Sequence, residues 1–142
     1  MTGSPTHRTA AWLAELLQPV RDFYYNFCVK DTFDFVSHIR DINMNDHKMV
    51  SFDIKSLFTS VPVNETIDII MTCIANNDFD LQGIGPRVFR NLLVLCTSDV
   101  QFLFNGHFYR QVDGVAMGSC LGPIFADIFI GCLEFTNVLV YS

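Results

Sequence analysis

Residues 51–62 read SFDIKSLFTSVP. With Met49 and Val50 before it, the start of this segment forms a short apolar run that predicts a strand covered on both faces. Asp53 places a carboxylate inside the run, where a charge is costly unless it is paired, protonated or bound to a cation. The position therefore predicts an aspartate that is paired, protonated or bound to a cation, whereas the spacing alone favours an aspartate at the end of the strand that caps the turn at residues 55–56.

A second distinctive segment is QVDGVAMGSCLGP, residues 111–123. Its glycines permit close backbone approach and unusual φ values. Taken alone, they are also consistent with a turn that only caps the following helix. The apolar run after this segment, residues 124–141, contains Asp127 and Glu134, either of which is costly at the centre of a bilayer. We therefore expect a buried helix there and no membrane span.

The clearest local signal is a β-hairpin from Val100 to Gln111. Asn105 and Gly106 join two aromatic-rich runs, as the two central residues of a type I′ turn do. Pairing Phe104 with His107 sorts the side chains onto two faces. One face would carry Val100, Phe102, Phe104, His107, Tyr109 and Gln111, and the other Gln101, Leu103, Phe108 and Arg110.

The remaining pattern predicts helices. Apolar spacing favours a helix over residues 8–27, which Pro19 should bend, and a helix over 121–139. Helix caps favour one helix after Asp31 and another after Asn64, which ends at about residue 76. A further helix should begin at Pro86. The fold class expected is α+β. We expect the Asp53 strand and the 100–111 hairpin to form a small antiparallel sheet with helices packed on one face.

Composition limits the possible functions. The chain has 142 residues, of which 50% are hydrophobic and 14 are Phe, so it is long and apolar enough for one packed domain. A formal net charge of −6 is unfavourable for a free-standing nucleic-acid binder. The mean hydropathy of +0.30 is high for an isolated domain and indicates surface that partner segments would cover.

The cysteines and histidines show no metal-binding pattern. The five cysteines form no Cys-x-x-Cys pair, and the four histidines are not spaced as ligands. No signal peptide precedes them. These features predict reduced thiols in an intracellular protein, either nuclear or cytoplasmic.

Several segments together resemble one family. FDIKSLFTSVP at residues 52–62 is similar to the first catalytic motif of reverse transcriptases, most closely those of Penelope-like retroelements. KDTFDF at 30–35, FNGHFYRQ at 104–111 and GVAMGS at 114–119 also look like that group, in the same order. The pattern departs at Cys120, where the family usually has Pro, and at Asp127, where it usually has Asn.

The resemblance implies a role for each residue of the first motif. Asp53 would be the catalytic aspartate that binds metal, and the backbone carbonyl of Ile54 would be a second ligand to Mg²⁺ or Mn²⁺. Two such cations about 4 Å apart activate the attacking hydroxyl and neutralise the triphosphate. Phe58 would lie under the incoming sugar and exclude a 2′-hydroxyl, although a core Phe is the alternative interpretation from composition.

The glycine-rich segment would bind the nucleotide and the templating base. The residues implied there are Gln111, Gly114, Met117, Gly118 and Ser119. In the complete enzyme the partners would be an RNA template, a DNA primer and a deoxynucleoside triphosphate. For the isolated chain we expect either no partner or self-association, and no membrane.

One element of the family pattern is absent from the 142 residues: an adjacent Asp-Asp pair, which would complete the two-metal site. We therefore expect residues 1–7 to be a disordered lead-in and residues 8–142 to be a partial reverse transcriptase domain, with fingers and palm but without the Asp-Asp motif and the thumb. Such a chain would be inactive alone, and whether it should be called an enzyme stays open. The alternative is a non-catalytic remnant or interaction domain derived from a reverse transcriptase.

Overall fold

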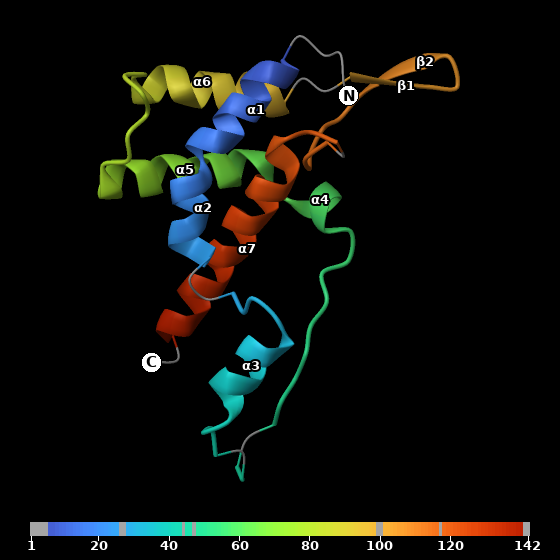
Figure 1. The fold of residues 1–142 in the computed structure, drawn as a ribbon. Helices are drawn as coiled ribbons and strands as arrows, with labels where there is room; N and C mark the ends of the chain where they lie inside the picture. The colour runs from blue at the N-terminus through green and yellow to red at the C-terminus, as the bar shows by residue number, and fades with distance from the viewer. Residues whose placement is uncertain are drawn as a thin grey trace.

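The computed structural model describes residues 6–25, 28–43, 45–46, 48–98, 101–116 and 118–140, with side chains to residue 136. These ranges contain seven helices and one two-stranded antiparallel sheet, so the fold is α+β (Figure 1). The helices are α1 His7–Leu16, α2 Gln18–Tyr25, α3 Thr32–Ile39, α4 Leu57–Ser60, α5 Val63–Asn77, α6 Pro86–Thr97 and α7 Leu121–Val140. The strands are β1 Gln101–Phe104 and β2 His107–Arg110.

The long helix α7 lies at the centre of the helical core. It packs along α2 and also contacts α1, α4 and α5, while α6 packs on α1 and α5 (Figure 1). The largest fully buried side chains are Phe89, Phe125, Leu13, Leu17, Ile67, Ile70, Leu93, Leu121 and Ile128. Each such side chain contributes about 1.5–3 kcal/mol when it leaves water. Within the described ranges, no helix combines the length and apolarity needed to cross a bilayer.

The helix predicted for residues 8–27 is bent, as expected, but the break comes before the proline. It divides at Leu17 into α1 and α2. Pro19 then lies in the first turn of α2, where a backbone N–H has no intrahelical acceptor and its absence costs little. Leu17 and Val20 on either side of Pro19 are both fully buried, so the bend keeps one continuous apolar face toward the core.

The helix starts predicted after Asp31, at Pro86 and at residue 121 are confirmed, and the one predicted after Asn64 is wrong. The Asp31 side chain caps α3 by accepting a hydrogen bond from the N–H of Asp34 at 2.8 Å. Pro86 begins α6. Asn64 is not the cap of α5, because the helix begins one residue earlier and Pro62 occupies the N-cap position.

The hairpin forms with the predicted register. Phe104 pairs with His107, and Asn105 and Gly106 have φ values of 49° and 78°, the two positive values that a type I′ turn needs. Phe102 and Tyr109 lie on the same face, with ring centroids 5.6 Å apart in a stacked arrangement. Val100, which was assigned to this face, lies outside the described residues.

The prediction that helices cover one face of the sheet is wrong for this hairpin. Every residue of β1 and β2 is exposed, and the hairpin projects away from the helical core (Figure 1). The reason is that α7 buries its apolar surface against α1, α2 and α5 instead.

The predicted strand around Asp53 is also not formed. Residues 48–54 are extended but belong to no ladder, and the described sheet contains β1 and β2 alone. Phe52 is 92% exposed, so the apolar run is not covered on either face. A strand needs a neighbour that pairs with its N–H and C=O groups, and no described segment pairs with this one.

Candidate functional site

The two segments singled out in the sequence meet in space. The first turns into the short helix α4, and the second follows β2 and leads into α7. The backbone N–H of Val115 donates a hydrogen bond to the carbonyl oxygen of Phe58 at 2.8 Å. This bond joins the segment after Asp53 directly to the glycine-rich turn.

Gly114 shows why a glycine is needed at this junction. Its φ is +78°, and a Cβ built there would lie 2.7 Å from the carbonyl oxygen of Thr59 and 2.9 Å from that of Phe58. Real Cβ atoms do not come so close to backbone atoms, so any side chain would push the turn away from α4. The expected close backbone approach is present, and the group approached is α4 itself.

Phe58 lies at the edge of this junction. Its side chain is 37% exposed, so Phe58 is not the core residue of the alternative interpretation. Its Cδ1 atom would lie 3.9 Å from a Cβ on Gly122, at the start of α7. A distance of 3.9 Å is an ordinary van der Waals contact, so the ring lies beside the backbone at the start of α7. Part of the ring surface is open to solvent.

Asp53 and Ile54 lie close to this junction in the sequence but do not join a metal-binding cluster. Both are exposed in the extended segment before α4. Among the described residues, no three Cys, His, Asp or Glu side chains are grouped so that they could hold a metal ion. Mg²⁺ prefers octahedral oxygen coordination with one or two carboxylates and substrate phosphates. Among the described residues, Asp53 is therefore not joined by further ligands in a group that could hold a metal ion.

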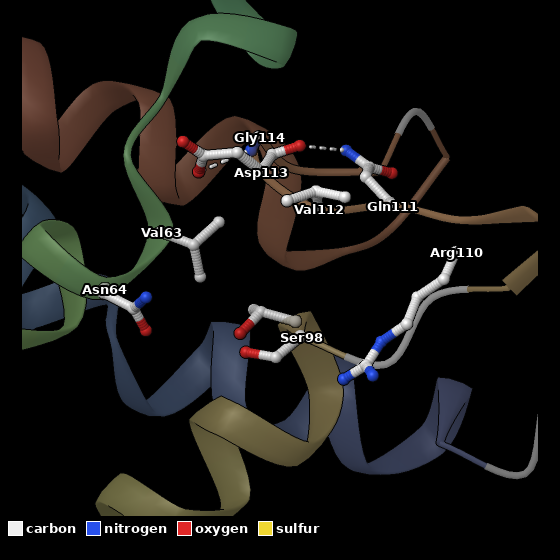
Figure 2. Close-up of a pocket in the computed structure, with 9 residues that line it drawn as sticks. Val63, Asn64, Ser98, Arg110, Gln111, Val112, Asp113 and Gly114 are labelled. Atoms are coloured by element: carbon white, nitrogen blue, oxygen red, sulfur yellow. Dashed lines mark hydrogen bonds between the residues drawn. The ribbon is translucent and has the colours of Figure 1, made fainter.

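Gln111 borders a neighbouring pocket of about 290 Å³ (Figure 2). The pocket lies between the start of α5, the end of α6 and the segment after β2. Its walls are formed by Val63, Asn64, Thr97, Ser98, Arg110, Gln111, Val112, Asp113 and Gly114. The Gln111 amide nitrogen donates to the carbonyl oxygen of Asp113 at 3.0 Å, and an Asp113 carboxylate oxygen accepts from the N–H of Gly114 at 2.8 Å (Figure 2). These two bonds fix the path of the backbone into the glycine turn.

The other predicted nucleotide-binding residues divide into three cases. Gly118 is exposed and has a φ of +86°, which fits a glycine at the end of the turn. The Ser119 hydroxyl accepts a hydrogen bond from the N–H of Leu121 at 3.3 Å, so it caps the start of α7. Met117 lies outside the described residues.

Asp127, one of the departures from the family pattern, has a structural partner. Its carboxylate accepts from Nε of Arg21 at 2.6 Å and joins α7 to α2. This hydrogen bond is the main cause that raises the pKa of Arg21. The Arg21 guanidinium also lies 4.7 Å from the centre of the Tyr25 ring. Asp127 therefore serves helix packing, away from the glycine turn.

The sequence did not identify Thr59 and Gly122 as part of the junction. Each contributes through its backbone position: Thr59 provides the surface that Gly114 approaches, and the backbone at Gly122 lies beside the Phe58 ring. The sequence signal for Gly122 was its place one turn after Gly118 at the start of a predicted helix. Thr59 carried no comparable signal.

Comparison of this chain with protein-family models, with curated proteins and with solved structures finds no match. The functional assignment rests on the residues and the geometry described above.

Proposed function

We propose that this chain is the central part of an RNA-directed DNA polymerase, a reverse transcriptase of the Penelope-like type. The observation that carries the proposal is the hydrogen bond between the Phe58 carbonyl and the Val115 N–H. It joins the two segments whose sequences resemble the metal-binding and the template-gripping motifs of that family. A nucleotide site shared by the two motifs would require these two segments to lie side by side, as they do.

The surroundings of Phe58 and Gly114 suit the roles that the resemblance implies. A half-exposed aromatic ring beside a glycine turn can support the sugar of an incoming deoxynucleotide and exclude a 2′-hydroxyl. Gly114 allows the turn to contact the backbone of α4 at Phe58 and Thr59, since it has no side chain. The resemblance would add Gln111, Gly118 and Ser119 to the same nucleotide site.

The exposed extended segment before α4 fits a palm that is completed by further chain. A palm-like sheet would pair residues 49–54 with the strand that bears the Asp-Asp motif. That pairing would cover Phe52 and bring Asp53 next to the other carboxylates. Mg²⁺ or Mn²⁺ bound there would activate the primer hydroxyl and neutralise the triphosphate. The 142 residues alone hold no adjacent Asp-Asp pair, so we expect no nucleotidyl transfer from them alone.

A complementation assay tests this function. The chain is mixed with a separate polypeptide that carries the Asp-Asp hairpin and thumb of a Penelope-like reverse transcriptase. Incorporation of deoxynucleotides on an RNA template with a DNA primer is measured in Mg²⁺ or Mn²⁺. We expect extension by the mixture and none by either polypeptide alone, because each supplies only part of the two-metal site.

Asp53→Asn and Asp41→Asn form a matched pair for this assay. Both aspartates are exposed, and each substitution removes one negative charge. We expect Asp53→Asn to lower extension by the mixture at least 10²-fold, since a metal ligand is lost, and Asp41→Asn to leave it unchanged. Extension by the mixture with Asp53→Asn at the level of the unmodified chain would contradict the proposal. So would extension by the isolated 142 residues.

A second function, that of a non-catalytic interaction domain, is favoured by the exposed apolar surface. Val112 is 99% exposed, and Phe33, Phe52 and Phe108 are also exposed. Single exposed apolar residues are common, but this number on one small chain is typical of surface that another polypeptide covers. Sedimentation velocity over a range of concentrations tests this function, because it measures whether the chain self-associates. A self-associating chain that fails the complementation assay would favour this function over the first.

A further inference from the structure

The hairpin formed by β1 and β2 stands apart from the helical core (Figure 1). Every residue of both strands is exposed, and within the described ranges the two strands pair only with each other. A two-stranded hairpin is at best marginally stable in water by itself. Both of its faces are therefore open to a partner, whose binding would also stabilise the hairpin.

One face of the hairpin consists of ring side chains, and we call it the aromatic face. The register pairs Phe102 with Tyr109 and Phe104 with His107, so these four residues share one side. The rings of Phe102 and Tyr109 are nearly parallel, with 18° between their planes and 5.6 Å between their centroids. The Phe104 ring lies next to them, with its centroid 6.3 Å from that of Tyr109. All four side chains of this face thus end in flat rings.

The opposite face of the hairpin has a different character. It carries Leu103 paired with Phe108 and Gln101 paired with Arg110. An aliphatic side chain, a single aromatic ring and two polar groups make a mixed surface. A polypeptide that docks through apolar area gains little from flat rings in particular, whereas a nucleobase stacks on them. The contrast between the faces therefore favours nucleobases as the partner of the aromatic face.

The charge of the hairpin also differs from that of the whole chain. The chain has 15 Asp and Glu residues and a formal net charge of −6, but residues 101–112 contain neither Asp nor Glu. Arg110 is the one Lys or Arg in this segment. A phosphate backbone that lies along the hairpin therefore meets no carboxylate of the hairpin. The next carboxylate in the sequence, that of Asp113, accepts a hydrogen bond from the N–H of Gly114.

The hairpin leads directly into the candidate site. β2 ends at Arg110, Gln111 follows, and Gly114 lies against the backbone of α4. The bond from the Gln111 amide nitrogen to the Asp113 carbonyl oxygen, 3.0 Å long, holds this short connection in shape. A polymer that lies along β2 toward its end therefore approaches the turn to which the nucleotide is assigned.

We propose that the aromatic face binds single-stranded RNA by stacking on its bases, and that it holds the unpaired template ahead of the nucleotide site. The inference rests on the proposed function, because that function supplies the template. Stacking would provide most of the affinity, since the hairpin has few cations to neutralise phosphates. Duplex RNA would not bind in this way, because its bases are stacked on each other and are not free to meet the rings.

Fluorescence anisotropy with the 142-residue chain and a labelled single-stranded oligouridylate tests this inference. Metal ions, deoxynucleotides and a second polypeptide are left out, so the result does not depend on polymerase activity. We expect saturable binding of the oligouridylate and much weaker binding of its duplex with oligoadenylate. A tenfold rise in salt should weaken binding no more than about fivefold, as expected for about one phosphate contact. A steeper salt dependence, or equal binding of the duplex, would overturn the inference.

Phe104→Leu and Phe108→Leu form a matched pair for this assay. The two side chains lie on opposite faces of the same hairpin and are 67% and 79% exposed. Leucine keeps much of the apolar volume but removes the flat ring. We expect Phe104→Leu to weaken oligouridylate binding about fivefold or more, and Phe108→Leu to leave it unchanged. Equal affinities of the two variants would overturn the inference, as would no binding by the unmodified chain.

Two further measurements separate this inference from its rivals. In the complementation assay, extension that Phe104→Leu leaves unchanged at low template concentration would overturn the aromatic face as a template site and would leave the polymerase proposal intact. RNA binding without extension would count against the polymerase alone. In sedimentation velocity, a dimer that Phe104→Leu dissociates and oligouridylate does not would assign the face to a second copy of the chain and overturn the inference.

Discussion

Gly114 is the residue on which the junction between the two motif segments depends most directly. We expect Gly114→Ala to lower the free energy of unfolding by about 2–4 kcal/mol. The substitution combines the cost of a positive φ, about 1–2 kcal/mol, with a clash against backbone atoms of α4 that would push the turn and α4 apart. Urea unfolding followed by circular dichroism measures the change.

Gly118→Ala is the matched control for that substitution. Gly118 has a similar φ of +86°, but no atom lies within 4 Å of the position where a Cβ would be placed. We expect Gly118→Ala to lower the free energy of unfolding by about 1–2 kcal/mol, because only the backbone conformation opposes the new side chain. Equal losses for the two substitutions would mean that the contact between Gly114 and Thr59 contributes nothing to stability.

The residue-scale predictions from the sequence succeeded where a local property was enough. Positive φ values at Asn105 and Gly106 follow from the turn type, and a capping side chain at Asp31 follows from its place before a helix. The partner of Asp127 was not predictable, because Arg21 is far away in the sequence and meets it only when α2 packs on α7. Thr59 was missed for the same reason.

At the scale of single elements, α3 is the helix that the core supports least. None of its residues is buried, so its stability depends on its own ends. We expect Asp31→Ala to raise hydrogen exchange in α3 about fivefold, because a lost N-cap costs about 1 kcal/mol. The free energy of global unfolding should stay the same within error. Asp41→Asn, just beyond α3, is the control, and faster exchange in α5 or α7 of the Asp31→Ala chain would contradict local unfolding.

Helices and the hairpin were predictable because their signals are local, whereas the strand around Asp53 was not. An apolar run such as residues 49–54 indicates that another element should pack on it, but it does not indicate which element that is. The same limit applies to β1 and β2. The register predicted from the sequence is correct, but the prediction that helices cover one face of the hairpin is wrong. Pairing and coverage depend on partners distant in the sequence, and the described residues do not provide them.

For the molecule as a whole, the buried thiols and Tyr24 link stability to alkaline pH. Burial raises the pKa of Cys73 and of Cys96 above the ordinary value of 9.0, and it raises the pKa of Tyr24 as well. In the unfolded chain these groups lose their protons at lower pH than in the folded chain. Their contribution is therefore fully present well below the unfolded thiol pKa of 9.0 and is lost as the pH rises through that value toward the folded pKa values.

We expect the free energy of unfolding to be constant between pH 7 and about 8.5 and to fall at higher pH. Each buried thiol, and Tyr24, lowers the free energy of unfolding by up to about 1.4 kcal/mol per pH unit between its unfolded and its folded pKa. Urea titrations at several pH values, with a reductant present, measure the slope. In Cys96→Ser the free energy of unfolding should fall less steeply with pH, because the variant lacks one titrating thiol and a serine hydroxyl does not titrate in this range. An unchanged slope in that variant would mean that the buried Cys96 thiol is not protonated preferentially in the folded chain.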